Sequence, residues 1–179
     1  RSMVTDERGL LYSASDDSTI KVWNTDRMAH VATLQGHTDF VRLLKLSKAN
    51  ELLYSAADDG TVKVWNRQNH QLVKTLDHGH EFEIEDMLLD EMSDSLYVTG
   101  ENKKIALWNT SDYTKQAIFR GHKGTVSSLA LDQRKRRLYS GSADKTVKVW
   151  DVVSLNALEI VHLARMIRQQ QRKQGGKRE

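Results

Sequence analysis

The chain has 179 residues, of which 39% are hydrophobic and 28% charged, and this composition is typical of a folded globular protein. It contains no cysteine, which excludes a disulfide framework and a thiolate metal site. The formal net charge of +3 is unevenly spread, because the segment from His162 onward holds six Lys or Arg against one Glu, and the residues before it sum to −2.

No apolar run approaches the ~18 residues that a membrane-spanning helix needs. No signal-peptide pattern opens the chain either. We therefore expect an intracellular protein, cytoplasmic or nuclear, without a membrane span.

One pattern recurs four times: a short apolar run, a turn of small and polar residues, and a second run that ends in Trp. The four copies occupy residues 11–24, 53–66, 96–109 and 137–151. Their tryptophans are separated by 42, 43 and 42 residues, at Trp23, Trp65, Trp108 and Trp150. Each copy predicts a strand, a tight turn and a strand, and the fixed period indicates a repeat architecture.

Two further strands are predicted in each full repeat. A polar turn after each Trp leads into a strand, at residues 28–35, 71–77, 114–120 and 155–162. Three of these strands precede a Gly-His pair and another apolar strand, at residues 40–46, 84–89 and 125–131. Four short strands per period, with no helical periodicity between them, predict an all-β protein.

The strand before each Trp explains why one repeat cannot be stable alone. In the fourth copy Val147 and Val149 share one face, while Lys148 and Trp150 share the other. Both faces thus carry apolar groups, each worth roughly 1.5–3 kcal/mol when buried, and a lone small sheet is marginal. Each sheet needs a neighbour on both sides, which radial stacking as the blades of a propeller provides. The predicted blades are residues 1–35, 36–77, 78–120 and 121–162.

In three repeats the His of the Gly-His pair precedes Trp by 28 residues, at His37–Trp65, His80–Trp108 and His122–Trp150. Over residues 1–162 this pattern resembles the WD-repeat (Trp-Asp) family of β-propellers. The resemblance implies that a His, a Ser or Thr, an Asp and the Trp of one repeat form a hydrogen-bonded tetrad that ties the blade together. The implied tetrads are His37, Ser55, Asp59 and Trp65 in the second repeat, and His122, Ser140, Asp144 and Trp150 in the fourth.

The other two repeats depart from this pattern. The first keeps Ser13, Asp17 and Trp23 but has no His, because Arg1 aligns with the middle of a repeat's first strand, so we expect an incomplete first blade. The third keeps His80 and Trp108, but Val98 and Asn102 replace Ser and Asp. We predict an incomplete tetrad there and the loosest of the four blades.

Several residue sets are compatible with catalysis, and for each a structural role is favoured. The Ser, His and Asp of a tetrad could suggest a hydrolase triad, but a catalytic set is needed once and this one recurs. The neighbouring carboxylates at 16–17 and 58–59 lie in predicted tight turns. His78 and His80 lack a third metal ligand, and no phosphate-binding Gly-rich loop is present. We predict no enzymatic activity, no metal and no cofactor.

The resemblance also implies a partner-binding rim around the central channel. It is lined by the residue before the tetrad Asp and by the residues three and five after the Gly-His histidine. Those positions hold Asp16, Phe40, Arg42, Asp58, Glu83, Glu85, Glu101, Thr125, Ser127 and Ala143. Five of these ten are acidic and one is aromatic, which favours a basic peptide segment. The alternative is a solvated rim with no particular partner. Charge reversal at Asp58 and Glu85 is expected to abolish peptide binding without loss of thermal stability.

The C-terminal tail, residues 163–179, is basic and is expected to be helical or disordered. Its positive charges are Arg165, Arg168, Arg172, Lys173, Lys177 and Arg178. They suit nucleic acid, an acidic lipid surface or an acidic protein partner, and a solvated extension is the alternative.

The predicted function is a non-enzymatic scaffold or adaptor that presents propeller-rim loops to protein partners. The alternative is a ribonucleoprotein component that contacts RNA through the basic tail. Propellers of the family usually close with about seven blades, which requires about 300 residues. We therefore expect these blades to be part of a larger propeller, with self-association through open blade faces and a closed four-blade form as the alternatives.

Overall fold

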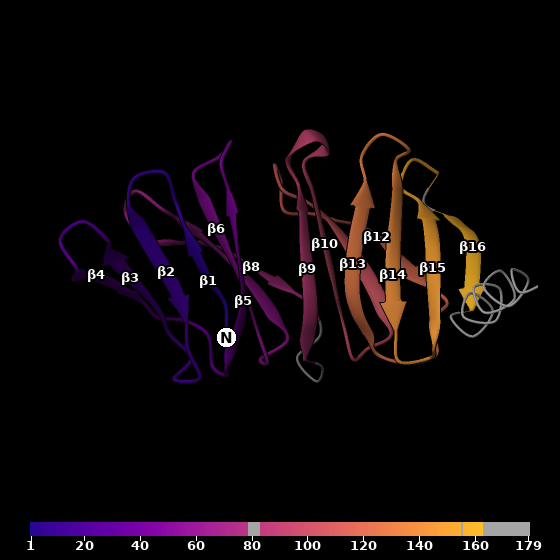
Figure 1. Cartoon of the computed structure of the whole chain (residues 1–179), viewed down its shortest axis with the longest axis horizontal. Helices are drawn as coiled ribbons and strands as arrows, with labels where there is room; N and C mark the ends of the chain where they lie inside the picture. The colour runs from indigo at the N-terminus through magenta and orange to yellow at the C-terminus, as the bar shows by residue number, and fades with distance from the viewer. Residues whose placement is uncertain (79–82, 155, 163–179) are drawn as a thin grey trace, which may run out of the picture.

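The computed structural model describes residues 1–78, 83–154 and 156–162, the last of these through its backbone alone. In these residues the chain forms four antiparallel sheets, each built from four strands that are consecutive in sequence. The sheets follow one another along the molecule, and the prediction of an all-β fold built from propeller blades is confirmed (Figure 1).

Each blade takes its strands in chain order, from the inner strand to the outer one. Blade 1 contains β1 (Met3–Thr5), β2 (Leu10–Ala14), β3 (Ile20–Asn24) and β4 (Ala29–Leu34). Blade 2 contains β5 (Val41–Ser47), β6 (Leu52–Ala57), β7 (Thr61–Asn66) and β8 (Leu72–Asp77). Blade 3 contains β9 (Ile84–Asp90), β10 (Ser95–Gly100), β11 (Lys104–Asn109) and β12 (Lys115–Arg120), with the 3-10 helix η1 (Glu91–Ser93) between its first two strands. Blade 4 contains β13 (Val126–Asp132), β14 (Arg137–Ser142), β15 (Thr146–Asp151) and β16 (Asn156–His162).

The inner strands of neighbouring blades pack against one another, so β1, β5, β9 and β13 run through the middle of the molecule (Figure 1). Blade 1 differs from the others at this position, since β1 has three residues where β5, β9 and β13 have seven each. This shorter strand agrees with the expectation that the first repeat is incomplete.

Tight turns connect the strands and repeat their geometry from blade to blade. The turn before each Trp-bearing strand has one residue in the left-handed region, at Ser18, Gly60, Lys103 and Lys145. The φ angles of these residues lie between 63° and 71°. Side chains with a Cβ adopt this region at a cost that glycine avoids, so Gly60 gives blade 2 the least strained of these turns.

Three apolar clusters fill the spaces between consecutive blades. At each interface a Tyr-bearing face meets the Trp-bearing face of the next blade, as Tyr12 of blade 1 does with Trp65 of blade 2. Tyr54 and Trp108 belong to the second cluster, and Tyr97 and Trp150 to the third. Because both faces of a sheet are apolar, the stability of each blade depends on its neighbours.

The outward faces of blades 1 and 4 carry the same residue types in a more exposed state. Trp23 and Tyr139 are half-buried, whereas Trp65 and Tyr54 are at most 2% exposed. Self-association through these faces stays a prediction. In the ranges the structure describes, no helix has the length and apolar character that crossing a membrane would need.

Candidate functional site

In blade 2 four residues from different segments form a continuous chain of hydrogen bonds. Trp65 on β7 donates from its indole Nε1 to Ser55 Oγ on β6, at 2.8 Å. His37, in the connection between β4 and β5, contacts Ser55 Oγ through Nε2 at 2.8 Å and Asp59 Oδ2 through Nδ1 at 2.8 Å. Asp59 lies in the turn between β6 and β7. A neutral His37 with its proton on Nδ1 satisfies all three contacts, because Ser55 then donates its hydroxyl proton to Nε2.

Asp59 is held as a carboxylate by further donors. Burial would raise its pKa, but hydrogen bonds from His37 and Thr61 outweigh it and hold the pKa well below the ordinary value. Thr61 donates to Oδ1 from its hydroxyl at 2.7 Å and from its backbone amide at 2.9 Å. The amide of Thr38 donates to Oδ2 at 3.0 Å. The turn and the connection are therefore joined through one carboxylate.

Blade 4 repeats this arrangement. The indole of Trp150 donates to Ser140 Oγ at 2.9 Å, and His122 contacts Ser140 Oγ at 2.7 Å and Asp144 Oδ2 at 2.8 Å. Burial would raise the pKa of Asp144, and hydrogen bonds from Thr146, the Lys123 amide and His122 lower it well below its ordinary range. Blade 1, whose repeat has no His, has a shorter version of this chain of hydrogen bonds. Trp23 donates to Ser13 Oγ at 3.0 Å.

Blade 3 differs at the side-chain contacts of the tetrad. The Nε1 of Trp108 is buried and has no hydrogen-bond partner in the part of the chain that the structure describes. Asn102, at the position of Asp59, places its Nδ2 at 2.9 Å from Nε2 of His78. His80, which the resemblance assigned to this tetrad, lies outside the described residues.

His78 had no predicted role in the tetrad, although a signal for its position is present in the sequence. In the second and fourth repeats the Gly-His histidine follows the last buried residue of the outer strand by three residues, after Leu34 and Phe119. In the third repeat His80 follows Leu76 by four. This additional residue puts His78 where the other repeats have the glycine.

The geometry favours a structural role for the tetrads of blades 2 and 4. Ser55 is fully buried, and its hydroxyl contacts both His37 and Trp65, so no substrate can reach it. The neighbouring carboxylates are also engaged separately, with Asp16 paired to Arg1 and Asp58 to Arg42. In the described residues no group of three or more His, Cys, Asp or Glu is arranged to hold a metal ion.

The predicted rim residues gather at one end of the blades. In blades 2 and 3 a backbone hydrogen bond joins two of the rim positions, from Asp58 N to Phe40 O at 3.0 Å and from Glu101 N to Glu83 O at 3.2 Å. The same bond in blade 4 runs from Ala143 N to Thr125 O at 2.9 Å. Ser127, on the inner strand of blade 4, is exposed.

Arg42 connects two blades at this rim. Its Nε pairs with Asp58 of its own blade, and its Nη2 donates to Glu83 Oε2 of blade 3 at 2.8 Å. Arg1 pairs with Asp16 and lies over the ring of Phe40, 5.6 Å from the ring centroid. Sequence reasoning had placed Arg42 on the rim without these partners, because the reach of a side chain between blades depends on their spacing.

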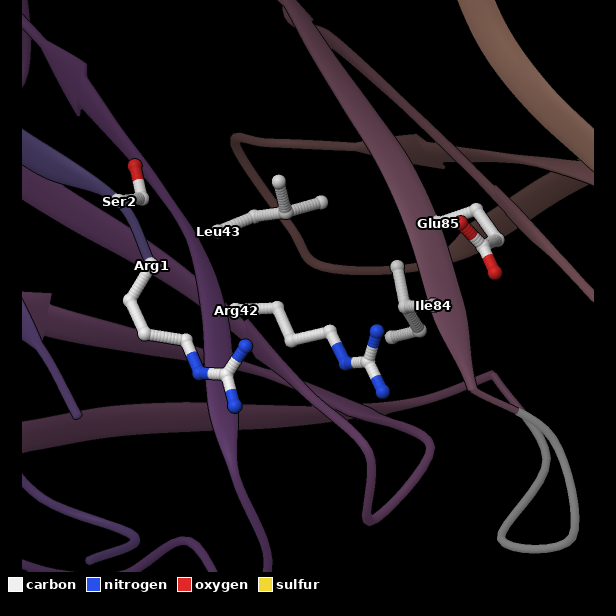
Figure 2. A pocket seen from close by; sticks show the side chains of 6 residues that line it. All are labelled: Arg1, Ser2, Arg42, Leu43, Ile84 and Glu85. Carbon is white, nitrogen blue, oxygen red and sulfur yellow. The ribbon is translucent and has the colours of Figure 1, made fainter. Parts of the chain in front are cut away.

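These contacts border an open cavity of about 400 Å³ between the inner strands of blades 1, 2 and 3. Figure 2 shows its lining residues, with Arg42 and Leu43 on β5, Ile84 and Glu85 on β9, and Arg1 and Ser2 ahead of β1. The guanidinium groups of Arg1 and Arg42 extend toward the same end of the strands (Figure 2). The basic tail predicted to bind nucleic acid or an acidic partner, residues 163–179, lies outside the described residues.

The four-stranded blades and their tetrads define the class: a propeller built from WD repeats. The family described as "WD domain, G-beta repeat" matches residues 4–24, 28–66 and 113–151, which is more than half of the chain. This chain belongs to that family. The Trp-bearing segment of the divergent third repeat, residues 96–109, falls between the second and third matched regions. No curated protein matches the chain. Proteins built from WD repeats generally mediate protein–protein interactions and are generally non-enzymatic scaffolds.

Proposed function

We propose that this chain is a non-enzymatic scaffold that holds a basic segment of a partner protein at the rim of its blades. The observation that carries the proposal is the charge arrangement around Arg42. Five rim carboxylates, at positions 16, 58, 83, 85 and 101, outnumber the arginines at positions 1 and 42, which leaves a formal charge of −3. Such a surface attracts cationic segments and orients them as they approach.

The arginines and the carboxylates have different roles in this proposal. Arg1 and Arg42 engage Asp16, Asp58 and Glu83, and they fix the shape of the rim cavity. Glu85 lines that cavity and Glu101 is exposed, so these two carboxylates are available to an incoming Lys or Arg. Phe40, another rim residue, is 42% exposed and offers an apolar surface.

Asp58 is unsuited to testing this function. Its side chain is 7% exposed and paired with Arg42, so charge reversal there would set two cations against each other in a nearly buried site. The expectation that reversal at Asp58 leaves thermal stability unchanged does not fit this contact. The test therefore uses Glu85 and Glu101.

The experiment measures binding of a fluorescein-labelled peptide of alternating Arg and Gly by fluorescence anisotropy, with a Gln-for-Arg peptide as the ligand control. The variant Glu85→Gln/Glu101→Gln is expected to bind at least about tenfold more weakly, because each lost charge-assisted contact is worth roughly 1.5–3 kcal/mol. Asp26→Asn is the matched control, since the exposed Asp26 lies in the turn after β3, at the opposite end of the blade from Asp16. Equal weakening by both variants, or none by the double variant, would rule out the rim as the binding surface.

RNA contact through the basic tail and an intracellular location remain predictions, because none of the described residues bears on either.

A further inference from the structure

Blade 4 has an apolar face that no other blade covers. In blades 1 to 3 the Tyr-bearing face packs on the next blade, and the tyrosines on these faces are at most 1% exposed. In blade 4 Leu138 belongs to the cluster shared with blade 3, so its neighbour on the strand, Tyr139, points away from that interface. Blade 4 lies at one end of the row of blades, and no further sheet follows it among the described residues (Figure 1).

Two positions on this face show how much cover it lacks. Tyr139 is half-buried, whereas the equivalent Tyr97 of blade 3 is 1% exposed. Val147, on the same face of the neighbouring strand, is also half-buried, whereas the equivalent Ile105 is 1% exposed. An apolar sheet face that is left open in this way is a site of association. We therefore looked for the segment that covers it.

The chain leaves blade 4 beside this face. The strand β16 pairs with β15 as far as His162, one residue beyond the partner of Val147, so the C-terminal tail begins at the edge of the open face. The tail does not begin another repeat. Leu163 and Ala164 stand as far after Trp150 as Gly-His stands after the Trp of the first and third repeats. In the printed sequence the tail is therefore the segment that follows blade 4 in place of a fifth blade.

The first part of the tail has the sequence pattern of an amphipathic helix. Leu163, Met166 and Ile167 have the spacing i, i+3 and i+4, which puts them on one side of a helix. Three arginines share the opposite side, at Arg165, Arg168 and Arg172. Apart from Ile167, residues 163–174 are all of the types with high helix propensity, and Gly175–Gly176 then ends the pattern. The pattern predicts a helix with one apolar and one basic side.

The length of this helix matches the width of the sheet. Residues 163–172 would form a helix about 15 Å long, at 1.5 Å per residue. Four strands at a spacing of roughly 4.8 Å place the inner strand β13 about 14 Å from β16. A helix that begins beside β16 can therefore cross the whole face, over Tyr139 and Val147, without a linker.

We propose that residues 163–172 form a helix that covers the outward face of blade 4, with its apolar side against Tyr139 and Val147. The contact removes apolar groups of both the tail and the blade from water, and it leaves the arginines in solvent. Because the tail is joined to the blade at His162, the contact is intramolecular, with an effective concentration of roughly millimolar or above. A helix of this kind acts as a cap, since the end of a repeat array needs a polar outer side.

The direct test is NMR of the intact chain. Nuclear Overhauser contacts are expected between the methyl groups of Met166 and Ile167 and the ring of Tyr139, together with helical chemical shifts for residues 163–172. Random-coil shifts over this segment, without a contact to Tyr139, would overturn the proposal.

Variants separate the apolar side of the helix from its basic side. The readout is the rate at which tetranitromethane nitrates Tyr139, followed by mass spectrometry of the peptide that contains it. Met166→Gln/Ile167→Gln keeps a good helix former at one position and a polar residue at both, and it should raise the rate at least about twofold by opening the contact. Arg165→Gln/Arg168→Gln is the matched control on the opposite side, and it should leave the rate unchanged. Equal acceleration by both variants would contradict the proposed packing.

A second copy of the chain is the competing occupant of this face. Nitration of Tyr139 is therefore measured over a range of protein concentrations, with the mass followed by sedimentation. Protection of Tyr139 that is independent of concentration supports the tail as the cover. Protection that rises in proportion to the dimer would assign the face to a second copy and would overturn the proposal.

Discussion

Val98 occupies, in the third blade, the position from which Ser55 accepts the indole proton of Trp65 in the second, and the Nε1 of Trp108 has no partner among the described residues. The two positions are equivalent in register, since Ser55 pairs with Lys63 and Val98 with Ala106. Val98 is fully buried and Trp108 is 8% exposed, so water does not reach the unpaired donor from the Val98 side. A buried unpaired donor costs about 1–3 kcal/mol.

Val98→Thr should therefore stabilise the protein. The threonine hydroxyl supplies the missing acceptor, and the loss of one buried methyl costs only about 0.8 kcal/mol. We expect the free energy of unfolding to rise by about 1 kcal/mol, measured by urea denaturation. Val22→Thr is the control, because Val22 is also fully buried but belongs to the cluster between blades 1 and 2, where the indole of Trp65 already has its partner. Its new hydroxyl should lower stability by about 1–3 kcal/mol, and an equal loss in both variants would contradict the explanation.

Ser55→Ala should be one of the more damaging small substitutions in blade 2. It removes the partner of both His37 and Trp65, which are 7% and 2% exposed. Leaving two buried polar groups unsatisfied should cost about 2–4 kcal/mol of unfolding free energy. Ser13→Ala is the comparison in blade 1, where only the half-buried Trp23 loses a bond and water can replace the hydroxyl. We expect less than about 1 kcal/mol there, and similar losses at both positions would indicate that the histidine adds nothing to the tetrad.

His78 should make the stability of the protein depend on pH in the mildly acidic range. Burial, followed by the charge of Lys115, lowers the pKa of His78 from 6.5 to about 4. Between these two values the unfolded chain binds a proton that the folded His78 does not, so stability falls as the pH drops through this window. The full effect is about 3 kcal/mol at pH 4, and this group contributes no further change below that pH.

The check compares the unfolding free energies of the parent protein and of His78→Gln at pH 7 and pH 4.5. The decrease on acidification should be smaller in the variant by about 2–3 kcal/mol. His30→Gln is the control, because it removes a histidine that is exposed on β4. A decrease of the same size in His78→Gln would mean that His78 is protonated in the folded protein well above pH 4.

The sheets could be predicted from the sequence because every repeat encodes them by the same local rules. Apolar alternation before each Trp, turn residues at fixed offsets and a constant period agree from repeat to repeat. The third copy keeps the spacing and the strands, although its tetrad residues differ. The residues of the second and fourth tetrads were implied by the resemblance to the WD-repeat family, and the structure brings each set into hydrogen-bond contact.

The contacts between blades could not be predicted in the same way. The bridge from Arg42 to Glu83 joins side chains that are 41 residues apart, and it depends on how far β5 lies from β9. A cavity of about 170 Å³ in blade 3, lined in part by Ala106 and Ile118, could not be predicted either. These two residues look like ordinary strand residues until they are compared with the equivalent pair in blade 2, where Lys63 donates to Thr75. Whether the third blade is the loosest stays a prediction.

The repeated left-handed turn residue gives a final prediction on stability. Lys145 has a φ of 66° in the turn before β15, where blade 2 has Gly60 at 71°. A residue with a Cβ pays about 1 kcal/mol or more in this region, while glycine increases the entropy of the unfolded chain by somewhat less. Lys145→Gly should therefore raise the unfolding free energy by about 0.5 kcal/mol, and Gly60→Ala should lower it by about 1 kcal/mol.

Lys135, an exposed turn residue of the same blade as Lys145, provides the control, since it is not among the residues with positive φ. Lys135→Gly should therefore destabilise by about 0.5–1 kcal/mol. If both Lys-to-Gly changes lowered stability alike in urea denaturation, backbone strain at Lys145 would not contribute, and the turn would owe its shape to the hydrogen bonds between Thr146 and Asp144 alone.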